Sequence, residues 1–517
     1  MTHYLLSAQQ MRDTDAYAIG QLGIPSLTLM EQAGQAVFRE VLARFTPAST
    51  VWIFCGKGNN GGDGLVLARL LARAHYPVRV IALAGREALS PDAQVMYDRL
   101  ESTNVPLYYW PCQAEIHPRP EDLAVDALLG TGANRPLHPP FDELSALWNS
   151  LPCRKLAIDL PTGVDATTGA LLGQPFRCDW TVTFCCEKYA HRLPLSQPVC
   201  GRVLCRDIGI PDEAVESTHP TVRLITQETL DQHMPRRDLN DHKGTYGHIL
   251  LVGGSLPMSG AISMAGLAAL RSGGGLVTLA VPDCIHSIVA GRAMEYMTLS
   301  LPSQEGSFAR EAIPPILEFA QKCDAVAIGC GMGVTDATCE LVHQLLTHLT
   351  CPLIVDADGI NALSQHIDWL QEASCPVILT PHPGEMARLL HTDTPSVQSD
   401  RLECARRFSG RYDATVVLKG PSTVVAWPNG QLFVNISGTS GMATGGSGDV
   451  LTGVTAALTS FAGLRGKPSL AAALAVWLHG RAGELAAASL SQYGMTATDI
   501  VAHLPAVLKK YDYMEAD

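Results

Sequence analysis

The N-terminal part of the chain alternates between short apolar runs and longer segments in which apolar residues recur at helical spacing. The segment GLVLARLLARAHY has helical spacing, and residues 7–45 predict further helices ahead of the first strand. Strands separated by helices predict a parallel sheet that is covered on both faces. The expected strands are 50–55, 77–85, 123–130, 155–163, 179–186 and 201–209.

The same alternation restarts after a polar, proline-containing segment at 210–240, which places a domain boundary near 215–225. STVVAW and QLFVNI flank Pro428-Asn429-Gly430 and predict a hairpin. The chain ends in helical segments that start near residues 449, 469 and 496. We therefore expect an α/β fold with domains at 1–215 and 225–511. The expected strands of the second domain are 248–254, 275–282, 324–331, 352–359, 376–384 and 414–420.

The composition supports two globular domains and argues against some classes of binding partner. The 517 residues exceed what one domain normally holds. A formal charge of −13 argues against nonspecific binding to nucleic acid or acidic membranes, which need a basic surface. The uncharged run from Ile249 to Leu270 is interrupted by glycine and proline, so it predicts a strand, a loop and a helix rather than a membrane span. The 15 cysteines lack zinc spacing, and no signal-peptide core is present, so we expect reduced thiols and a cytoplasmic location.

Two dissimilar glycine loops carry the chemistry: GKGNNGGDG at 56–64 and TGGSGDVLTG at 444–453. Each opens a helical segment, where glycine lets backbone N–H groups approach an anion. The first loop is not a P-loop, because no Lys-Ser/Thr follows at the required place. Two such loops predict two nucleotide-type sites in one chain.

The first site gains polar residues from the strand ends. Asp126, Asp159 and Thr162 lie at the ends of expected strands, and residues at strand ends line the ligand crevice of a parallel sheet. Asn60, Asp126 and Thr162 are oxygen donors of the kind that a hard cation prefers. Lys188 is placed to act with Asp159 in acid–base chemistry. The alternative is that Asp126, Asp159 and Asp165 only cap helices or form turns.

The second site centres on Asp449, which begins a helix at the GSGD loop. Its carboxylate could accept a proton from a substrate hydroxyl while the helix N-terminus binds a phosphoryl group. The alternative is a helix-start residue without chemistry. Lys419 and the following residues come off a strand and could hold nucleotide phosphates. VDADGINAL and TPHPGEMARLL add Asp358, His382 and Glu385 at neighbouring strand ends.

Residues 1–215 resemble the NAD(P)H-hydrate epimerase family, through GKGNNGGDG, DALLGTG, DLPTGVD and the helical lead-in LTLMEQAG. The resemblance implies a Rossmann-like, three-layer α/β/α domain. It implies K⁺ ligands at Asn60, Asp126 and Thr162, where the family usually has serine at the last position. It also implies substrate contacts at Asn59, Asn60, Gly61, Gly62, Asp63, Gly130, Thr131, Gly132, Ala133, Asn134, Arg135, Pro136 and Asp159.

Residues 225–510 resemble the ribokinase-like superfamily and, more closely, the ADP/ATP-dependent NAD(P)H-hydrate dehydratases. The motifs are HKGTYGHILLVGGS, SGAISMAGLAALRSGGGLV, TPHPGE, KGPST and TGGSGDVLTG. In the turn GCGMG, Cys330 stands where the family commonly has proline, and we expect it to affect turn rigidity more than chemistry. The implied hydrate contacts are Ala261, Gly331, Gly333, His382 and Asp449. The implied nucleotide contacts are Lys419, Gly420, Pro421, Ser422, Thr423 and Gly448.

The two resemblances together imply a bifunctional repair enzyme. Its first domain would interconvert the R and S hydrates of NADH or NADPH, with Asp159 and Lys188 handling protons. Its second would dehydrate the S form with ADP and Mg²⁺, through Asp449. The alternative is a ribokinase-like small-molecule kinase with an N-terminal ligand-binding or scaffolding module. We also expect a homo-oligomer, because the apolar helix at 26–45 favours an interface over packing on its own domain.

Overall fold

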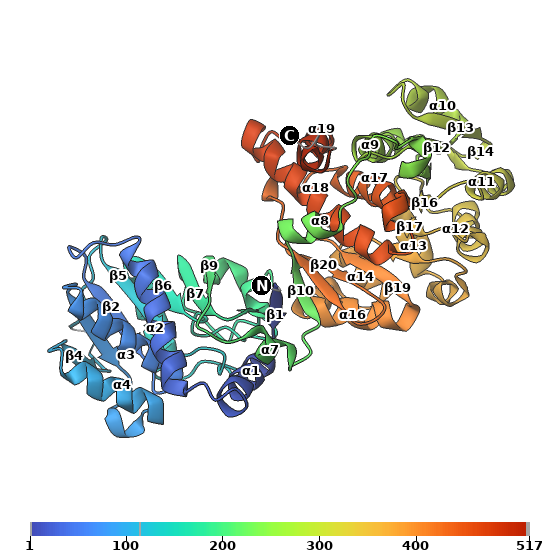
Figure 1. Cartoon of the computed structure of the whole chain (residues 1–517). Coiled ribbons are helices and arrows are strands. Elements are labelled where there is room, and N and C mark those ends of the chain that lie inside the picture. Colours follow the sequence, from blue (N-terminus) through green and yellow to red (C-terminus); the bar gives the residue numbers. More distant parts are fainter. Residues whose placement is uncertain (1–2, 113–114, 513–517) are drawn as a thin grey trace. The chain divides into compact units, whose positions relative to one another are not determined.

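The computed structural model describes residues 3–112 and 115–512. The chain forms two compact units, one ending at Arg223 and the other beginning at Leu224 (Figure 1). Each unit has its own α/β core, and each is described separately below.

The first unit is built on a seven-stranded parallel sheet with the order β4-β3-β2-β5-β6-β7-β9. Its strands are β2 (Val51–Cys55), β3 (Val78–Ala82), β4 (Leu107–Tyr109), β5 (Leu123–Ala127), β6 (Arg154–Ile158), β7 (Trp180–Phe184) and β9 (Arg202–Arg206). Its helices are α1 (Ala8–Gly20), α2 (Ser26–Leu42), α3 (Asn59–Arg73), α4 (Pro91–Glu101), α5 (Phe141–Ser150), α6 (Gln197–Cys200) and α7 (Asp212–Glu216). Apart from this sheet, β1 (Tyr4–Leu6) pairs in parallel with β8 (Glu187–Lys188) and antiparallel with β10 (Val222–Ile225).

Both faces of this sheet are covered, as the alternation along β2 shows. Ile53 and its alternate neighbours belong to the core formed with α2, α3 and α4. Trp52 and Phe54 belong to the opposite core, where the ring of Phe54 packs edge-on against Trp148 of α5 at 5.5 Å. The three-layer arrangement is thereby confirmed, and it leaves the carboxyl ends of the strands free to carry a site.

Helix α2 packs its apolar face onto its own unit. Leu29, Met30, Val37 and Val41 are buried in the same core as α3 and β2. The prediction that this apolar face forms a subunit interface is wrong, because the face is already covered within the chain. The homo-oligomer stays a prediction without this support.

The second unit has a sheet ordered β13-β12-β11-β16-β17-β18-β19-β20-β21. The strands from β13 to β19 are parallel, and β20 and β21 add the predicted hairpin, with Thr423 opposite Asn435. The strands are β11 (His248–Val252), β12 (Leu276–Pro282), β13 (Met297–Leu301), β16 (Ala325–Ile328), β17 (Leu353–Val355), β18 (Val377–Leu379), β19 (Ala414–Leu418), β20 (Thr423–Ala426) and β21 (Leu432–Asn435). A separate small hairpin joins β14 (Ser303–Gln304) to β15 (Ser307–Phe308).

Helix α17, which carries the candidate catalytic residue Asp449, is almost entirely buried. Every residue from Val450 to Ser460 is buried, and α17 packs between α9 and α18 (Figure 1). The helices of this unit are α8 (Gln227–His233), α9 (Ser259–Arg271), α10 (Asp283–Ala290), α11 (Ile313–Ala320), α12 (Asp336–His348), α13 (Ala357–Ser364), α14 (Pro383–Leu389), α15 (Thr394–Ser399), α16 (Arg401–Tyr412), α17 (Ser447–Ser460), α18 (Pro468–Leu490) and α19 (Ala497–Leu508). The uncharged run 249–270 falls on β11, a loop and α9, as predicted. Across the described residues, no helix combines the length and hydropathy that crossing a membrane requires.

Candidate functional sites

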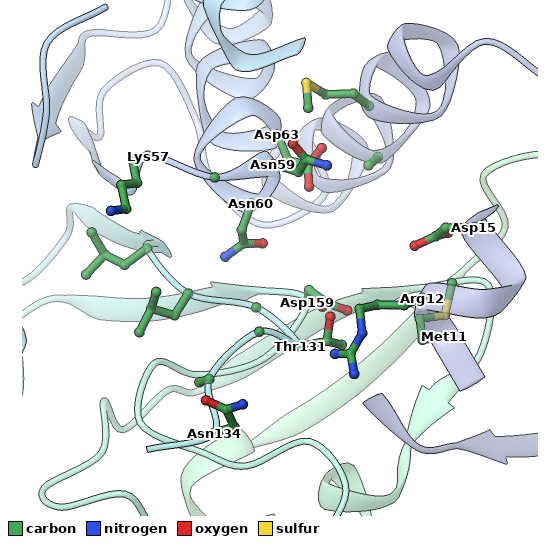
Figure 2. A pocket seen from close by; sticks show the side chains of 18 of the residues that line it. Met11, Arg12, Asp15, Lys57, Asn59, Asn60, Asp63, Thr131, Asn134 and Asp159 are labelled. Atoms are coloured by element: carbon green, nitrogen blue, oxygen red, sulfur yellow. The ribbon is translucent and has the colours of Figure 1, made fainter. Parts of the chain in front are cut away.

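A pocket of about 870 Å³ lies at the carboxyl ends of the strands in the first unit (Figure 2). It is lined by the start of α3, by the loop after β5, by Asp159 and Lys188, and by α1 and α2. The predicted residues that line it are Asn59, Asn60, Asp63, Gly130, Thr131, Gly132, Ala133, Asn134, Arg135, Pro136, Asp159 and Lys188. The structure therefore brings the epimerase-like motifs to one cavity.

Gly61 and Gly62 serve packing rather than the cavity wall. A Cβ at Gly61 would lie 2.0 Å from the Gly56 carbonyl oxygen, and one at Gly62 would lie 2.6 Å from the Met30 sulfur. Neither glycine is among the described residues that line the pocket. Their predicted substrate contacts have no geometric counterpart here, and the two glycines instead let α3 approach its neighbours.

Asp159 follows β6 with a left-handed backbone, at a φ of 65°. Its Oδ1 accepts from Lys188 Nζ at 2.7 Å and from Thr183 Oγ1 at 3.0 Å. Burial acts to raise the pKa of Asp159, but the Lys188 ammonium outweighs it and the pKa lies below its ordinary value. Burial acts to lower the pKa of Lys188, and the Asp159 carboxylate raises it above its ordinary value. The predicted pair therefore exists as a buried carboxylate and ammonium.

His191 fixes the loop that carries this pair. Its Nδ1 accepts from the Lys188 backbone N–H at 2.9 Å, so the ring proton lies on Nε2, which donates to the Asp159 carbonyl at 2.9 Å. Burial and the nearby Lys188 ammonium lower the pKa of His191 to about 4. His191 is a neutral connector between the two residues, and sequence analysis did not identify it.

Two further carboxyl groups line the pocket. Burial raises the pKa of Asp15 on α1 to about 6, partly offset by Lys188. Burial, with the charges of Asp159 and Asp15, raises the pKa of Asp63 well above its ordinary value. Asp15 and its neighbour Arg12 were missed because the sequence around them predicted a helix and contained no motif that points to a site (Figure 2).

Beside the pocket, the three predicted cation ligands divide into a bonded pair and an unpartnered amide. Asp126 accepts from the Thr162 N–H at 2.7 Å and from the Thr162 hydroxyl at 2.9 Å. Burial raises the pKa of Asp126 to about 6, and in the described chain no cationic side chain pairs with it. Both polar atoms of the Asn60 side chain are buried without a hydrogen-bond partner among the described residues. A buried carboxylate without a counter-ion and an unpartnered amide oxygen suit a monovalent cation.

By contrast, Asp165 is a turn residue, as the simpler reading held. Its Oδ1 accepts from the Thr167 and Thr168 backbone N–H groups at 2.9 and 2.8 Å. It therefore satisfies local backbone donors, and it is not among the described residues that line the pocket.

In the second unit, Asp449 lies in the first turn of α17. Gly446 caps the helix with a φ of 91°, where a Cβ would lie 2.5 Å from Met264. Burial and the charge of Asp356 raise the pKa of Asp449 to about 6, while a hydrogen bond from the Cys330 thiol acts to lower it. Cys330 therefore contacts Asp449 directly. Its effect is not limited to the rigidity of the turn, which was the expectation from the sequence.

Asp356 at the end of β17 organises the charges around Asp449. Its Oδ1 lies 2.7 Å from Lys419 Nζ, and its Oδ2 accepts from Thr452 of α17 at 2.7 Å. Glu385 lies 3.8 Å from the same ammonium. Sequence analysis selected Asp358 in this segment, but Asp358 instead accepts from the Gly333 N–H at 2.9 Å. Asp356 was missed although it stands directly after a buried strand.

Of the predicted hydrate contacts, Gly331 and Gly333 lie in the turn after β16, Ala261 packs near Gly331, and His382 follows β18. Gly331 has a φ of 62°, and a Cβ there would lie 2.9 Å from Ala261. Gly333 has a φ of 76°, and a Cβ there would lie 4.0 Å from Ser307 Oγ. His382 caps α14 by accepting from the Gly384 and Glu385 N–H groups through Nδ1, so its Nε2 carries the proton.

The KGPST segment lies next to the start of α17. A Cβ at Gly448 would lie 3.4 Å from Lys419 Nζ. Ser422 has a left-handed backbone with a φ of 52°, and the Thr423 hydroxyl donates to the Gly420 carbonyl at 2.8 Å. Pro421 lies between them. Buried Arg401 supports the segment by donating to the Leu418 and Lys419 carbonyls at 3.0 and 3.1 Å.

The first unit has a carboxylate-rich pocket, and the second has a glycine-capped helix that presents a buried aspartate. Together these two parallel α/β units define a two-domain enzyme of the nucleotide-handling α/β class. Residues 26–190 match the family model described as YjeF-related protein N-terminus. Residues 249–506 match the model described as NAD(P)H-hydrate dehydratase.

Full-length relatives carry both parts. The bifunctional NAD(P)H-hydrate repair enzyme of Moorella thermoacetica is 41% identical over 98% of this chain and 97% of its own length. That of Escherichia coli is 32% identical over 98% and 94%. A crystal structure titled ADP/ATP-dependent NAD(P)H-hydrate dehydratase from Bacillus subtilis, co-crystallised with ATP and Mg²⁺, is 31% identical, covers 56% of this chain and 98% of that chain, and has a TM-score of 0.49. The chain belongs to the family of bifunctional NAD(P)H-hydrate repair enzymes.

Proposed function

We propose that this chain repairs hydrated NADH and NADPH in two steps, with the epimerase activity in the first unit and the dehydratase activity in the second. The observation that supports this most is the separate clustering of both motif sets, one around Asp159 and Lys188 and the other around Asp449. The cytoplasmic location remains a prediction.

In the epimerase unit, the substrate hydroxyl is bound to a ring carbon next to the ring nitrogen. Loss of this hydroxyl as water, followed by addition of water to the other face, inverts the centre. Asp159 is the proton-handling group, and the Lys188 ammonium keeps it ionised. The Asn59–Asp63 loop and the Gly130–Pro136 loop bind the nucleotide, since both line the pocket through most of their residues.

A potassium ion is the proposed cofactor of this unit, held by Asn60, Asp126 and Thr162. The fit rests on the counter-ion-free Asp126 carboxylate and the unpartnered Asn60 amide. When bound, the ion would supply positive charge near the substrate loops. The Asp126–Thr162 hydrogen bonds would hold the adjacent loop after β5, where Thr162 also accepts from the Leu129 N–H at 3.1 Å.

In the dehydratase unit, Asp449 accepts the proton of the substrate hydroxyl as that oxygen attacks the terminal phosphate of ADP. AMP leaves, and the hydroxyl becomes a phosphate ester, which is a better leaving group than hydroxide. The ring nitrogen's lone pair then expels phosphate, and loss of a proton from the neighbouring carbon restores the double bond. Backbone N–H groups at the start of α17 stabilise the phosphoryl charge during transfer.

ADP and Mg²⁺ complete this proposal. Lys419, Gly448 and the Gly420–Thr423 turn lie together beside α17 and are the proposed contacts for the nucleotide phosphates. Ala261, Gly331, Gly333 and His382 are the proposed contacts for the hydrate. Mg²⁺, when bound with the nucleotide, would neutralise phosphate charge.

The test is recovery of NADH absorbance from a mixed R and S hydrate preparation, with ADP and Mg²⁺ and then with ATP and Mg²⁺. Full recovery with ADP, well beyond the S fraction, is the expected result and needs both activities. Arrest at the S fraction would contradict the epimerase assignment and favour a scaffolding first unit. A stable phosphorylated product without recovery would favour a small-molecule kinase.

A further inference from the structure

Helix α1 places a carboxyl group in the epimerase pocket for which the assignments above give no role. Asp15 projects from α1 toward the space flanked by Asp63 and Asp159 (Figure 2). It is half-buried, and in the described chain its side chain forms no hydrogen bond or ion pair. A partly desolvated carboxyl group without a partner is costly unless a ligand uses it.

The backbone around Asp15 is fixed relative to Lys188. Ser7 caps α1 by accepting from the Gln10 N–H at 3.1 Å, and Gln10 Oε1 accepts from the Tyr189 hydroxyl at 3.1 Å. The strand that precedes α1 pairs Leu6 with Lys188 in parallel register. Asp15 is therefore held in place by the same segment that carries the Asp159 partner.

The pocket thus presents carboxyl groups of different proton affinity from separate elements. Asp159 at the end of β6 is kept ionised by the Lys188 ammonium. Burial raises the pKa of Asp15 on α1 to about 6, so it holds a proton more readily. The other charged groups coupled to Asp15 are the Asp63 carboxyl and the Lys188 ammonium. Arg12, on the same helix, also lines the pocket.

Resting on the proposed epimerase function, we propose that Asp15 is the catalytic acid of the first unit, working across the substrate from Asp159. Inversion requires water to leave one face of the ring and to add to the other. Two carboxyl groups of different proton affinity that line the same pocket from separate elements provide an acid for one face and a base for the other.

The proposed step balances. The Asp15 carboxyl gives its proton to the substrate hydroxyl, the carbon–oxygen bond breaks, and the ring nitrogen's lone pair forms a carbon–nitrogen double bond. A water molecule adds to the other face, its oxygen bonds to the ring carbon, and Asp159 takes its proton. The electron pair returns to the nitrogen. Exchange with solvent resets both carboxyl groups, and the reverse direction exchanges their roles.

The test is the rate of R-to-S exchange measured without ADP, in the full chain and in Asp15→Asn. We expect kcat to fall by about 10²–10⁴-fold, as for loss of a general acid, with a smaller change in KM. The alkaline limb of the wild-type pH profile, which reports the acid, should disappear in the variant. In heavy-oxygen water, the wild type should incorporate label with each inversion.

The matched control is Asp13→Asn, an exposed carboxyl on the same helix. It should keep wild-type epimerisation. Dehydration of the pure S hydrate with ADP should be unchanged in both variants, which shows that the second unit is folded, and thermal unfolding of the first unit should match that of the wild type. Equal rates for Asp15→Asn and wild type, or a KM change with kcat and the pH profile intact, would overturn the role of Asp15. A wild-type chain without epimerisation would instead refute the proposed function.

Discussion

Lys188 Nζ lies 2.7 Å from Asp159 Oδ1, and both groups are largely removed from water, with 1% and 14% of their side chains exposed. The second unit repeats this arrangement at the end of β17, where Lys419 Nζ lies 2.7 Å from Asp356 Oδ1. In both units, a buried ammonium keeps a strand-end carboxyl ionised against the effect of burial. The Coulombic attraction gains strength in the low local dielectric, which also makes each unpaired charge expensive.

Lys188→Met is expected to lower the free energy of unfolding of the first unit by about 3–5 kcal/mol, because it leaves the Asp159 carboxylate buried and unpaired. Without the ammonium, burial raises the pKa of Asp159, so the acid limb of the epimerase pH profile should move to higher pH. Chemical denaturation and the pH dependence of R-to-S exchange measure the two effects. Lys155→Met, which removes a half-buried lysine bonded to the Leu151 carbonyl, should leave the pH profile in place.

Asp449→Asn is expected to reduce dehydration of the S hydrate by about 10²–10⁴-fold, because the amide cannot accept the hydroxyl proton. Epimerisation should be unchanged. In the wild type, the pKa of Asp449 is raised to about 6, so the base is protonated below that value and the rate should rise with pH through it. Asp336→Asn, at the equivalent first turn of α12, is the control. If Asp336→Asn also lost dehydratase activity, the acidic residue in the first turn of a helix would be needed for folding in general and not for chemistry at Asp449.

Cys330→Ala is expected to shift the dehydratase pH profile to higher pH by roughly one pH unit. The thiol donates a hydrogen bond to the Asp449 carboxylate and acts to lower the pKa of that group, and a hydrogen bond to a charged group contributes about 1.5–3 kcal/mol. The pH dependence of kcat/KM for the S hydrate measures the shift. Cys375→Ala removes a buried thiol in the loop before β18 and should leave the profile unchanged. Identical profiles for both variants and wild type would refute the role of Cys330.

Potassium is expected to raise the thermal unfolding temperature of the first unit, because a ligand that binds only the folded state stabilises it by mass action. Choline at the same ionic strength should have no such effect. Asp126→Asn and Asn60→Ala should each remove the potassium-dependent part of the stabilisation. A shift of equal size in all three proteins would show that the effect is one of ionic strength and not of this site.

The sequence by itself determined the elements and the edge of the sheet on which each site lies. Strands separated by helices predicted a sheet covered on both faces, which β2 shows through Ile53 on one side and Phe54 on the other. The strand pattern places Asp126 near the end of β5 and Asp159 directly after β6, and glycine loops open α3 and α17. These are local signals, because side-chain direction along a strand and backbone freedom at glycine depend on near neighbours.

Tertiary structure decided which side chains meet. The sequence pointed to Asp358 and not to Asp356. Only the strand order, in which Lys419 comes from two strands away in the sheet, brings the Lys419 ammonium against Asp356. Asp15 reaches the pocket because α1 packs beside the carboxyl end of the sheet, and a prediction that the segment is helical does not specify where it packs. Contacts between residues far apart in sequence depend on strand order and helix docking, and these are set by packing of the whole core rather than by any one segment.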